Sequence, residues 1–281
     1  MIPAEQPIVF TCQGESLLGM LAAPASPAAV GVLIIVGGPQ YRAGSHRQFV
    51  LLARALAAAG YPCFRFDHRG MGDSTGEAQD FSASGPDIAA ALDAFMANSP
   101  GLQRVVLWGL CDAASTSLMY WHETRDPRVA GMVLLNPWMR SEQTLAQARI
   151  RYYYLRRLLD RDFWAKIRRG GWNPWRSLQD LLANLRRAGR PDNAAAGDFR
   201  ESMLSGWRTF PGPSLLILSG NDMTAAEFLT ALGNRPDGPA LLARPSVTRV
   251  DVAGADHTFA KAAWRDAVLR VMLAWLHKEV R

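Results

Sequence analysis

Val-Val-Leu-Trp-Gly-Leu-Cys-Asp-Ala-Ala-Ser-Thr-Ser occupies residues 105–117 and decides the fold. The first part of this stretch is apolar and β-prone, which favours a strand, and the part after Asp112 is made of small residues typical of a helix. A single cysteine, Cys111, stands between the two parts. A sharp turn from strand to helix presents its corner residue as a nucleophile in the pattern Gly-x-nucleophile-x-Gly. Gly109 and Ala113 are the small flanking residues that such a strained corner needs, so we predict that Cys111 is a nucleophile.

Two other interpretations of this stretch stay open. Cys111 could be a structural cysteine, because free cysteines are among the most buried residues of proteins. Asp112 could instead be the nucleophile, but that register puts Leu110 two residues before the corner, where a strained turn disfavours a large side chain. We therefore rank Cys111 above Asp112.

Length and composition favour one large domain, or one domain with an insertion. The chain has 281 residues, of which 49% are hydrophobic. The sequence contains no run of about 18 apolar residues, so we predict no membrane-spanning helix. The first residues lack the basic and apolar regions of a signal peptide. Three cysteines without metal-like spacing predict no disulfide framework and no metal site, and we expect no cofactor. They also favour a cytoplasmic location.

Apolar β-prone runs alternate with helical periodicity through most of the chain. An opening hairpin is predicted at residues 7–13 and 16–22, and further strands at 30–36, 62–66, 104–108, 129–135, 214–219 and 247–252. Helices are predicted around residues 49–57, 86–97, 112–122 and 259–278. This alternation predicts an α/β fold with a mostly parallel, doubly wound sheet.

The alternation is interrupted between residues 140 and 210, where helical patterns occur without a convincing strand. We predict a helical cap over residues 140–210, inserted into a core made of residues 1–139 and 211–281. Residues 149–190 contain twelve basic and three acidic residues, although the whole chain carries a net charge of only +6. A solvated arginine-rich face explains such a segment, and so does a surface for an anionic glycan or a protein partner. No nucleic-acid-binding motif accompanies it, so we expect no nucleic-acid partner.

Reactive side chains follow three of the predicted strands, in the order Cys111, Asp222, His257. Ligand sites collect at the carboxyl ends of strands in open α/β sheets, and the order nucleophile, acid, base is that of α/β-hydrolases. His257 could take the thiol proton and return it to the leaving group, while Asp222 orients the imidazole. A lone Asp or His at such a place is more often a cap or turn residue, so the prediction depends on their joint occurrence.

Four other histidines compete for the role of the base: His46, His68, His122 and His277. Of these, His46 is the most serious rival because it lies near the loop that follows the strand at 30–36. His46 and Arg42 are therefore also candidates for an auxiliary role in the site.

A tetrahedral intermediate needs hydrogen-bond donors for its oxyanion. One donor is expected to be the backbone N–H of Asp112, the residue after the nucleophile. The other is expected from Gly38, Gln40 or Tyr41, since Pro39 has no N–H to donate. The polar loop at residues 67–74 is predicted to be structural, with a pair between its own Asp67 and Arg69.

Several motifs together resemble the exosortase A system-associated hydrolase 1 family. They are Gly37-Gly38-Pro39-Gln40-Tyr41-Arg42, Gly44-Ser45-His46-Arg47, Arg65-Phe66-Asp67, Gly70-Met71-Gly72-Asp73-Ser74, Gly109-Leu110-Cys111-Asp112-Ala113-Ala114-Ser115 and Leu135-Asn136-Pro137-Trp138. The resemblance implies an α/β-hydrolase fold with a cap, in a bacterial protein encoded beside exopolysaccharide and protein-sorting machinery. The cysteine at the corner is similar to that of dienelactone hydrolases.

These observations together predict a carboxylic-ester hydrolase that acts on small-molecule esters with short to medium acyl chains, through a Cys-His-Asp triad and an acyl-cysteine intermediate. Thioester hydrolysis and acyl transfer in exopolysaccharide metabolism are close alternatives. A non-catalytic accessory protein that binds a glycan or a partner through the basic cap is the alternative of a different class. The oligomeric state stays open.

Overall fold

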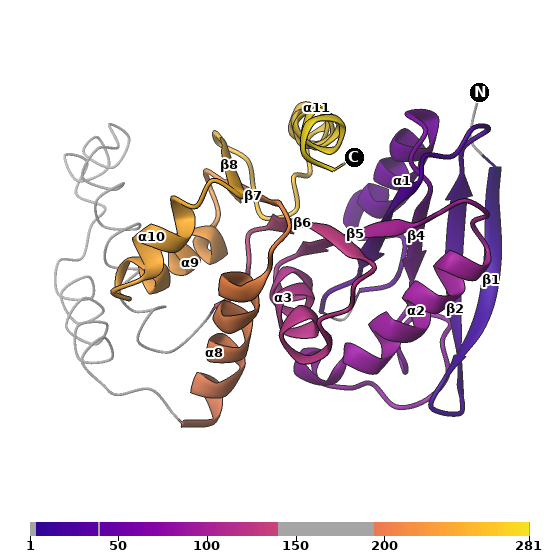
Figure 1. Ribbon diagram of the computed structural model, residues 1–281, viewed down its shortest axis with the longest axis horizontal. Coiled ribbons are helices and arrows are strands. Elements are labelled where there is room, and N and C mark those ends of the chain that lie inside the picture. The colour runs from indigo at the N-terminus through magenta and orange to yellow at the C-terminus, as the bar shows by residue number, and fades with distance from the viewer. Residues whose placement is uncertain (1–3, 39, 140–193, 281) are drawn as a thin grey trace, which may run out of the picture.

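Figure 1 shows the computed structural model, which describes residues 4–38, 40–139 and 194–280. One sheet of eight strands has the order β1-β2-β4-β3-β5-β6-β7-β8. The pairs β1/β2 and β2/β4 are antiparallel and every other pair is parallel. The strands are β1 (Ala4–Cys12), β2 (Glu15–Ala23), β3 (Val30–Ile35), β4 (Cys63–Phe66), β5 (Arg104–Leu110), β6 (Val129–Leu135), β7 (Ser214–Ser219) and β8 (Val247–Val252). The predicted α/β class with a mostly parallel sheet is confirmed.

Helices cover both faces of this sheet, as Figure 1 shows. On one face lie α1 (Gln48–Ala58) and α11 (Ala262–Glu279). The opposite face carries α2 (Gly85–Ala97), α3 (Asp112–Thr124), α8 (Ala194–Thr209), α9 (Met223–Gly233) and α10 (Gly238–Leu242). Two short 3-10 turns, η1 (Ser45–Arg47) and η2 (Phe81–Ala83), precede α1 and α2.

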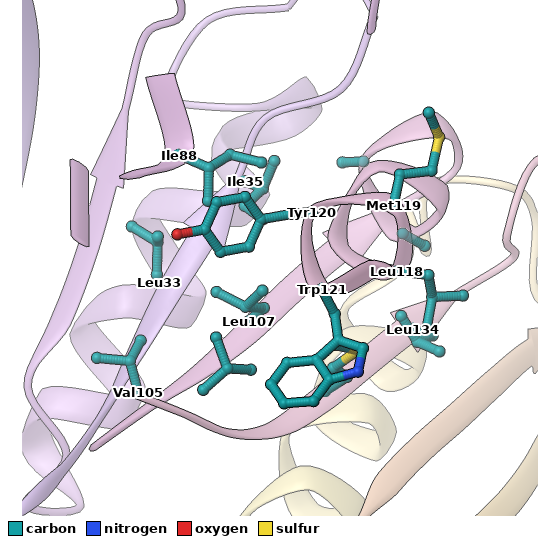
Figure 2. Packing of buried hydrophobic residues seen from close by; sticks show 14 of the residues in the cluster. Leu33, Ile35, Ile88, Val105, Leu107, Leu118, Met119, Tyr120, Trp121 and Leu134 are labelled. Atoms are coloured by element: carbon teal, nitrogen blue, oxygen red, sulfur yellow. The ribbon is translucent and has the colours of Figure 1, made fainter. Parts of the chain in front are cut away.

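The central strand β5 shows why the core has two halves. Successive side chains of a strand point to opposite faces of the sheet. Leu107 packs with Leu118 and Tyr120 of α3, and Figure 2 shows these side chains together. Trp108 points to the other face, where its ring lies 5.5 Å from that of Phe49 of α1. Burial on both faces accounts for the continuous apolar runs of the central strands.

Two element boundaries differ from the prediction for reasons that depend on tertiary structure. β5 extends to Leu110, two residues beyond the predicted end, because Gly109 and Leu110 pair with the last residues of β6. α11 begins at Ala262 rather than near Phe259, because Phe259 has a φ of 52° and cannot continue a helix.

The predicted cap lies mostly at residues 140–193, outside the described residues. Of the predicted segment, α8 is described, and it packs against α3 with Gly206 at the contact. A Cβ on Gly206 would lie 2.0 Å from the carbonyl oxygen of Leu118, so only glycine lets these two helices approach so closely. The division into core and cap stays a prediction. Among the described helices, none has the length and apolar character needed to cross a bilayer.

Candidate active site

Cys111 occupies the corner between β5 and α3. Its φ of 64° and ψ of −123° are strained for any residue other than glycine. The turn is tight, because a Cβ on Gly109 would lie 2.4 Å from the carbonyl carbon of Ala113. The backbone N–H of Cys111 donates to the carbonyl of Leu135 over 2.9 Å, which ties the corner to the end of β6. The side chain of Cys111 is partly exposed at this edge of the sheet.

Asp222 follows β7 and caps the N-terminus of α9. Its Oδ1 accepts a hydrogen bond from the N–H of Thr224 over 3.1 Å, and its Oδ2 one from Ala225 over 3.3 Å. These bonds fix the orientation of a carboxylate whose side chain is only 7% exposed. The capping role and the role predicted for the site therefore coexist in one residue.

His257 follows β8 and lies between Asp222 and Cys111. Its Nδ1 is 2.8 Å from Oδ2 of Asp222, and Cys111 is near enough to affect its charge state. Burial lowers the pKa of His257, but the hydrogen bonds and charges of Asp222 and Cys111 outweigh burial and raise this pKa to about 10. The structure thus places the predicted thiol beside an imidazole that is hydrogen-bonded to the predicted carboxylate.

Asn136 holds the loops of this site together, and the sequence analysis did not assign it a role. Its Nδ2 donates to Oγ of Ser219 over 2.8 Å and to the carbonyl of His257 over 3.1 Å. Its Oδ1 accepts from the N–H of Ser219 over 2.8 Å, and Ser219 Oγ donates to the carbonyl of Asp256. Asn136 is fully buried with a φ of 42°, a conformation that asparagine tolerates better than most residues. Its position directly after β6 was the available signal.

We expect Asn136→Ala to destabilise the fold by about 2–4 kcal/mol, because it leaves buried backbone and hydroxyl groups unpaired and places alanine at a positive φ. Urea unfolding followed by tryptophan fluorescence measures this change. Thr209→Ala, which removes an exposed hydroxyl at the end of α8, is the control and should change stability by less than about 0.5 kcal/mol. If Asn136→Ala lost no more stability than the control, Asn136 would not hold the loops of the site together.

The residues predicted to donate to the oxyanion lie in different environments. The N–H of Gly38 donates to Oδ2 of Asp112 over 2.7 Å, and the N–H of Ala113 donates to Oδ1 over 3.0 Å. Burial raises the pKa of the Asp112 carboxyl, although these backbone hydrogen bonds oppose the change. Gly38 is thus placed beside residue 112. Tyr41 is half exposed, and the Oε1 of Gln40 is buried without a partner in the described structure.

Arg42 and His46 lie in other surroundings. Arg42 donates from its backbone to Asp67 over 2.6 Å and pairs with both Asp67 and Asp73. The predicted pair within the loop is therefore wrong, since Arg69 pairs with Asp87 instead. His46 is exposed in η1, with a φ of 53°.

A second group contains the same residue types but cannot do the same chemistry. Asp87 lies between Cys12 and His68, at 3.2 Å from the sulfur and 3.3 Å from Nδ1. Burial and the hydrogen bond to Asp87 raise the pKa of Cys12 to about 11, so this thiol stays protonated and unreactive. In the described ranges, no three or more His, Cys, Asp or Glu side chains are arranged to hold a metal ion.

A parallel sheet with a strained strand-to-helix corner and an Asp-bound histidine at the neighbouring strand ends defines the class of α/β-hydrolases. The profile described as "alpha/beta hydrolase fold" matches residues 31–259, and the chain belongs to this family. No curated protein sequence matches the chain.

Three solved structures illustrate the likeness. The Pyrococcus furiosus esterase Pf2001 has a TM-score of 0.67 at 15% identity, covering 99% of this chain and 92% of that one. The esterase domain of a Rhodothermus marinus protein has a TM-score of 0.61 at 17% identity, covering 99% and 100%. The alpha/beta hydrolase GrgF from Penicillium sp. sh18 has a TM-score of 0.62 at 20% identity, covering 98% and 99%. At these identities the likeness establishes the fold alone.

Proposed function

We propose that this protein hydrolyses small carboxylic esters through an acyl-cysteine intermediate, with Cys111 as nucleophile. The observation that carries the proposal is the His257–Asp222 hydrogen bond beside Cys111, which stands at a strained corner. The raised pKa of His257 keeps the imidazole protonated at neutral pH. A neighbouring imidazolium stabilises a thiolate, which is the reactive form of cysteine.

Acylation begins when the Cys111 sulfur attacks the carbonyl carbon of the ester. A C–S bond forms and the carbonyl electron pair moves to oxygen, giving an oxyanion. When the carbonyl re-forms, the bond to the alcohol oxygen breaks, and this oxygen takes a proton from His257. Because Nδ1 of His257 is bound to Asp222, this proton leaves from Nε2.

Deacylation uses the same groups in reverse. Neutral His257 accepts a proton from water as the water oxygen attacks the thioester carbon. Collapse of the second oxyanion breaks the C–S bond and releases the carboxylic acid and the thiolate. Asp222 keeps the imidazole in the required tautomer throughout and stabilises its charged form.

Trapping of the acyl group tests the proposal directly. After brief mixing with p-nitrophenyl acetate and an acid quench, peptide mass spectrometry should find one acetyl group on the peptide that contains Cys111. The peptide that contains Cys12 should stay unmodified, because the raised pKa keeps that thiol protonated. Acetyl groups on Cys12 and Cys111 alike, or release of p-nitrophenolate without any acetyl-Cys111, would count against the proposal.

The wider setting is part of the same proposal and is supported by sequence motifs. The resemblance to exosortase-associated hydrolases favours a bacterial protein that acts in exopolysaccharide metabolism, with a thioester or an acyl-transfer acceptor as alternatives to a simple ester. Three free cysteines favour a reducing, cytoplasmic location. A screen of acyl esters, thioesters and glycan acceptors separates these reactions. The alternative of a non-catalytic binding protein depends on residues 140–193, outside the described residues.

A further inference from the structure

The carboxylate of Asp112 holds a backbone donor that a reacting ester would need. Gly38 N–H donates to its Oδ2 over 2.7 Å, a short distance typical of a bond to a charged acceptor. Ala113 N–H donates to its Oδ1 over 3.0 Å. The N–H of Gly38 is one of the oxyanion donors predicted from the sequence.

The fit of this carboxylate is close. A Cβ on Gly37 would lie 2.1 Å from Oδ1 of Asp112, so glycine at position 37 leaves just enough room for the carboxylate. A larger residue there would push the carboxylate away from Gly38. The contact therefore depends on residues from two distant parts of the chain, the loop after β3 and the first residue of α3.

An ester carbonyl at Cys111 cannot use donors that are already occupied. A developing oxyanion is stabilised when N–H groups lie 2.7–3.1 Å from it and bind nothing else. A carboxylate in the same place competes for these groups, and its own negative charge repels the oxyanion. The affinity of a site for its ligand falls in proportion to the fraction of molecules in which the site is free.

We propose that Asp112 is a self-inhibiting gate of the oxyanion hole, whose carboxylate must leave Gly38 before Cys111 can be acylated. The inference rests on the proposed function and adds to it a residue that limits the rate. A cavity of about 160 Å³ adjoins the carboxylate and is lined on its other sides by His68, Phe81 and Thr116. This cavity gives the displaced side chain a place to go.

Removal of the carboxylate should speed acylation. We expect Asp112→Ser to raise the rate of acetylation of Cys111 by p-nitrophenyl acetate roughly 10- to 100-fold, up to the lower end of the range of about 10²- to 10³-fold that a single oxyanion donor contributes. The serine hydroxyl stays a polar group at the start of α3 but is too short to reach Gly38. Asp112→Asn keeps the size of the side chain and loses its charge, so its gain should be in the same direction and smaller. Stopped-flow release of p-nitrophenolate measures both rates.

Alkylation of Cys111 by iodoacetamide distinguishes a gate from a merely structural role of Asp112. A structural change would alter the alkylation and acylation rates alike. Alkylation needs the thiolate but forms no oxyanion, so its rate reports only the change in thiol reactivity. The acylation gain in Asp112→Ser should exceed the alkylation gain at least tenfold. Asp80→Asn, which removes an exposed carboxylate at the same cavity, is the matched control and should leave both rates within twofold.

The outcomes separate this inference from the proposed function. One outcome contradicts the gate alone: wild-type Cys111 is acylated, but both Asp112 variants are acylated more slowly than the wild type, or gain no more in acylation than in alkylation. In that case Asp112 is not a gate, and the proposed function stands. If neither the wild type nor a folded Asp112 variant is acylated while iodoacetamide still labels Cys111, both proposals are wrong. Circular dichroism identifies a variant that has not folded, and the other substitution then decides.

Discussion

Replacing Cys111 with alanine is expected to lower kcat for p-nitrophenyl acetate by about 10⁴- to 10⁶-fold, to the level left by binding and backbone donors alone. The sulfur is the only atom of the corner side chain that can form the acyl bond. The fold should persist, because alanine fills less space than cysteine at a partly exposed position and keeps the same hydrogen bond from its N–H to Leu135. Steady-state release of p-nitrophenolate measures the change.

The other two cysteines provide matched controls for this experiment. Cys12 and Cys63 are fully buried, and burial raises the pKa of each thiol. Cys12→Ala and Cys63→Ala should keep kcat within about threefold of the wild type, although each loses some stability through the cavity it creates. Activity that survives in Cys111→Ala but falls in Cys12→Ala would identify Cys12 as the nucleophile. That result would overturn the proposed mechanism.

Local sequence patterns predicted the sheet well because each strand carries its own signal. The continuous apolar run of β3 and the strand-to-helix pattern around Cys111 need no knowledge of distant residues. The end of β5 was placed two residues early because Gly109 is in the strand through its pairing with β3 and β6. Glycine lacks any strand signal of its own, so this boundary depends on tertiary contact.

The same distinction separates what could and could not be predicted of the site. Cys111, Asp222 and His257 were predicted as site residues because each follows a strand, and the carboxyl ends of parallel strands meet at one edge. Asn136 also follows a strand, but its role depends on a hydrogen bond to Ser219, 83 residues away, which no local pattern indicates. The Asp112–Gly38 bond spans 74 residues, and Arg42 rather than Arg69 pairs with Asp67 across 25. Contacts between distant side chains leave no periodic pattern in the sequence.

Asp222→Asn is expected to lower kcat by about 10⁴-fold while the protein stays folded, because an amide cannot hold the imidazole in the tautomer that the reaction needs. Asparagine is as good a helix N-cap as aspartate, so the hydrogen bonds from Thr224 and Ala225 to this side chain should remain. Loss of activity without loss of α9 would therefore isolate the effect of the carboxylate on His257. Asp237→Asn, at an exposed carboxylate beside α10, is the control and should leave kcat within about twofold of the wild type.

The pH dependence of Asp222→Asn follows from the raised pKa of His257. Burial lowers this pKa, and the hydrogen bonds to Asp222 and Cys111 together raise it to about 10, so removing the carboxylate should bring it down toward its ordinary value. Because protonated His257 donates the leaving-group proton, the basic limb of kcat/KM should move from near pH 10 to a lower pH in the variant. A folded-state pKa above the unfolded value stabilises the fold fully below pH 6.5, and this stabilisation disappears as pH rises through 10. The stability lost in the variant should therefore be largest in urea unfolding at pH 6 and smallest at pH 10, and an equal loss at both values would show that Asp222 does not hold the proton on His257.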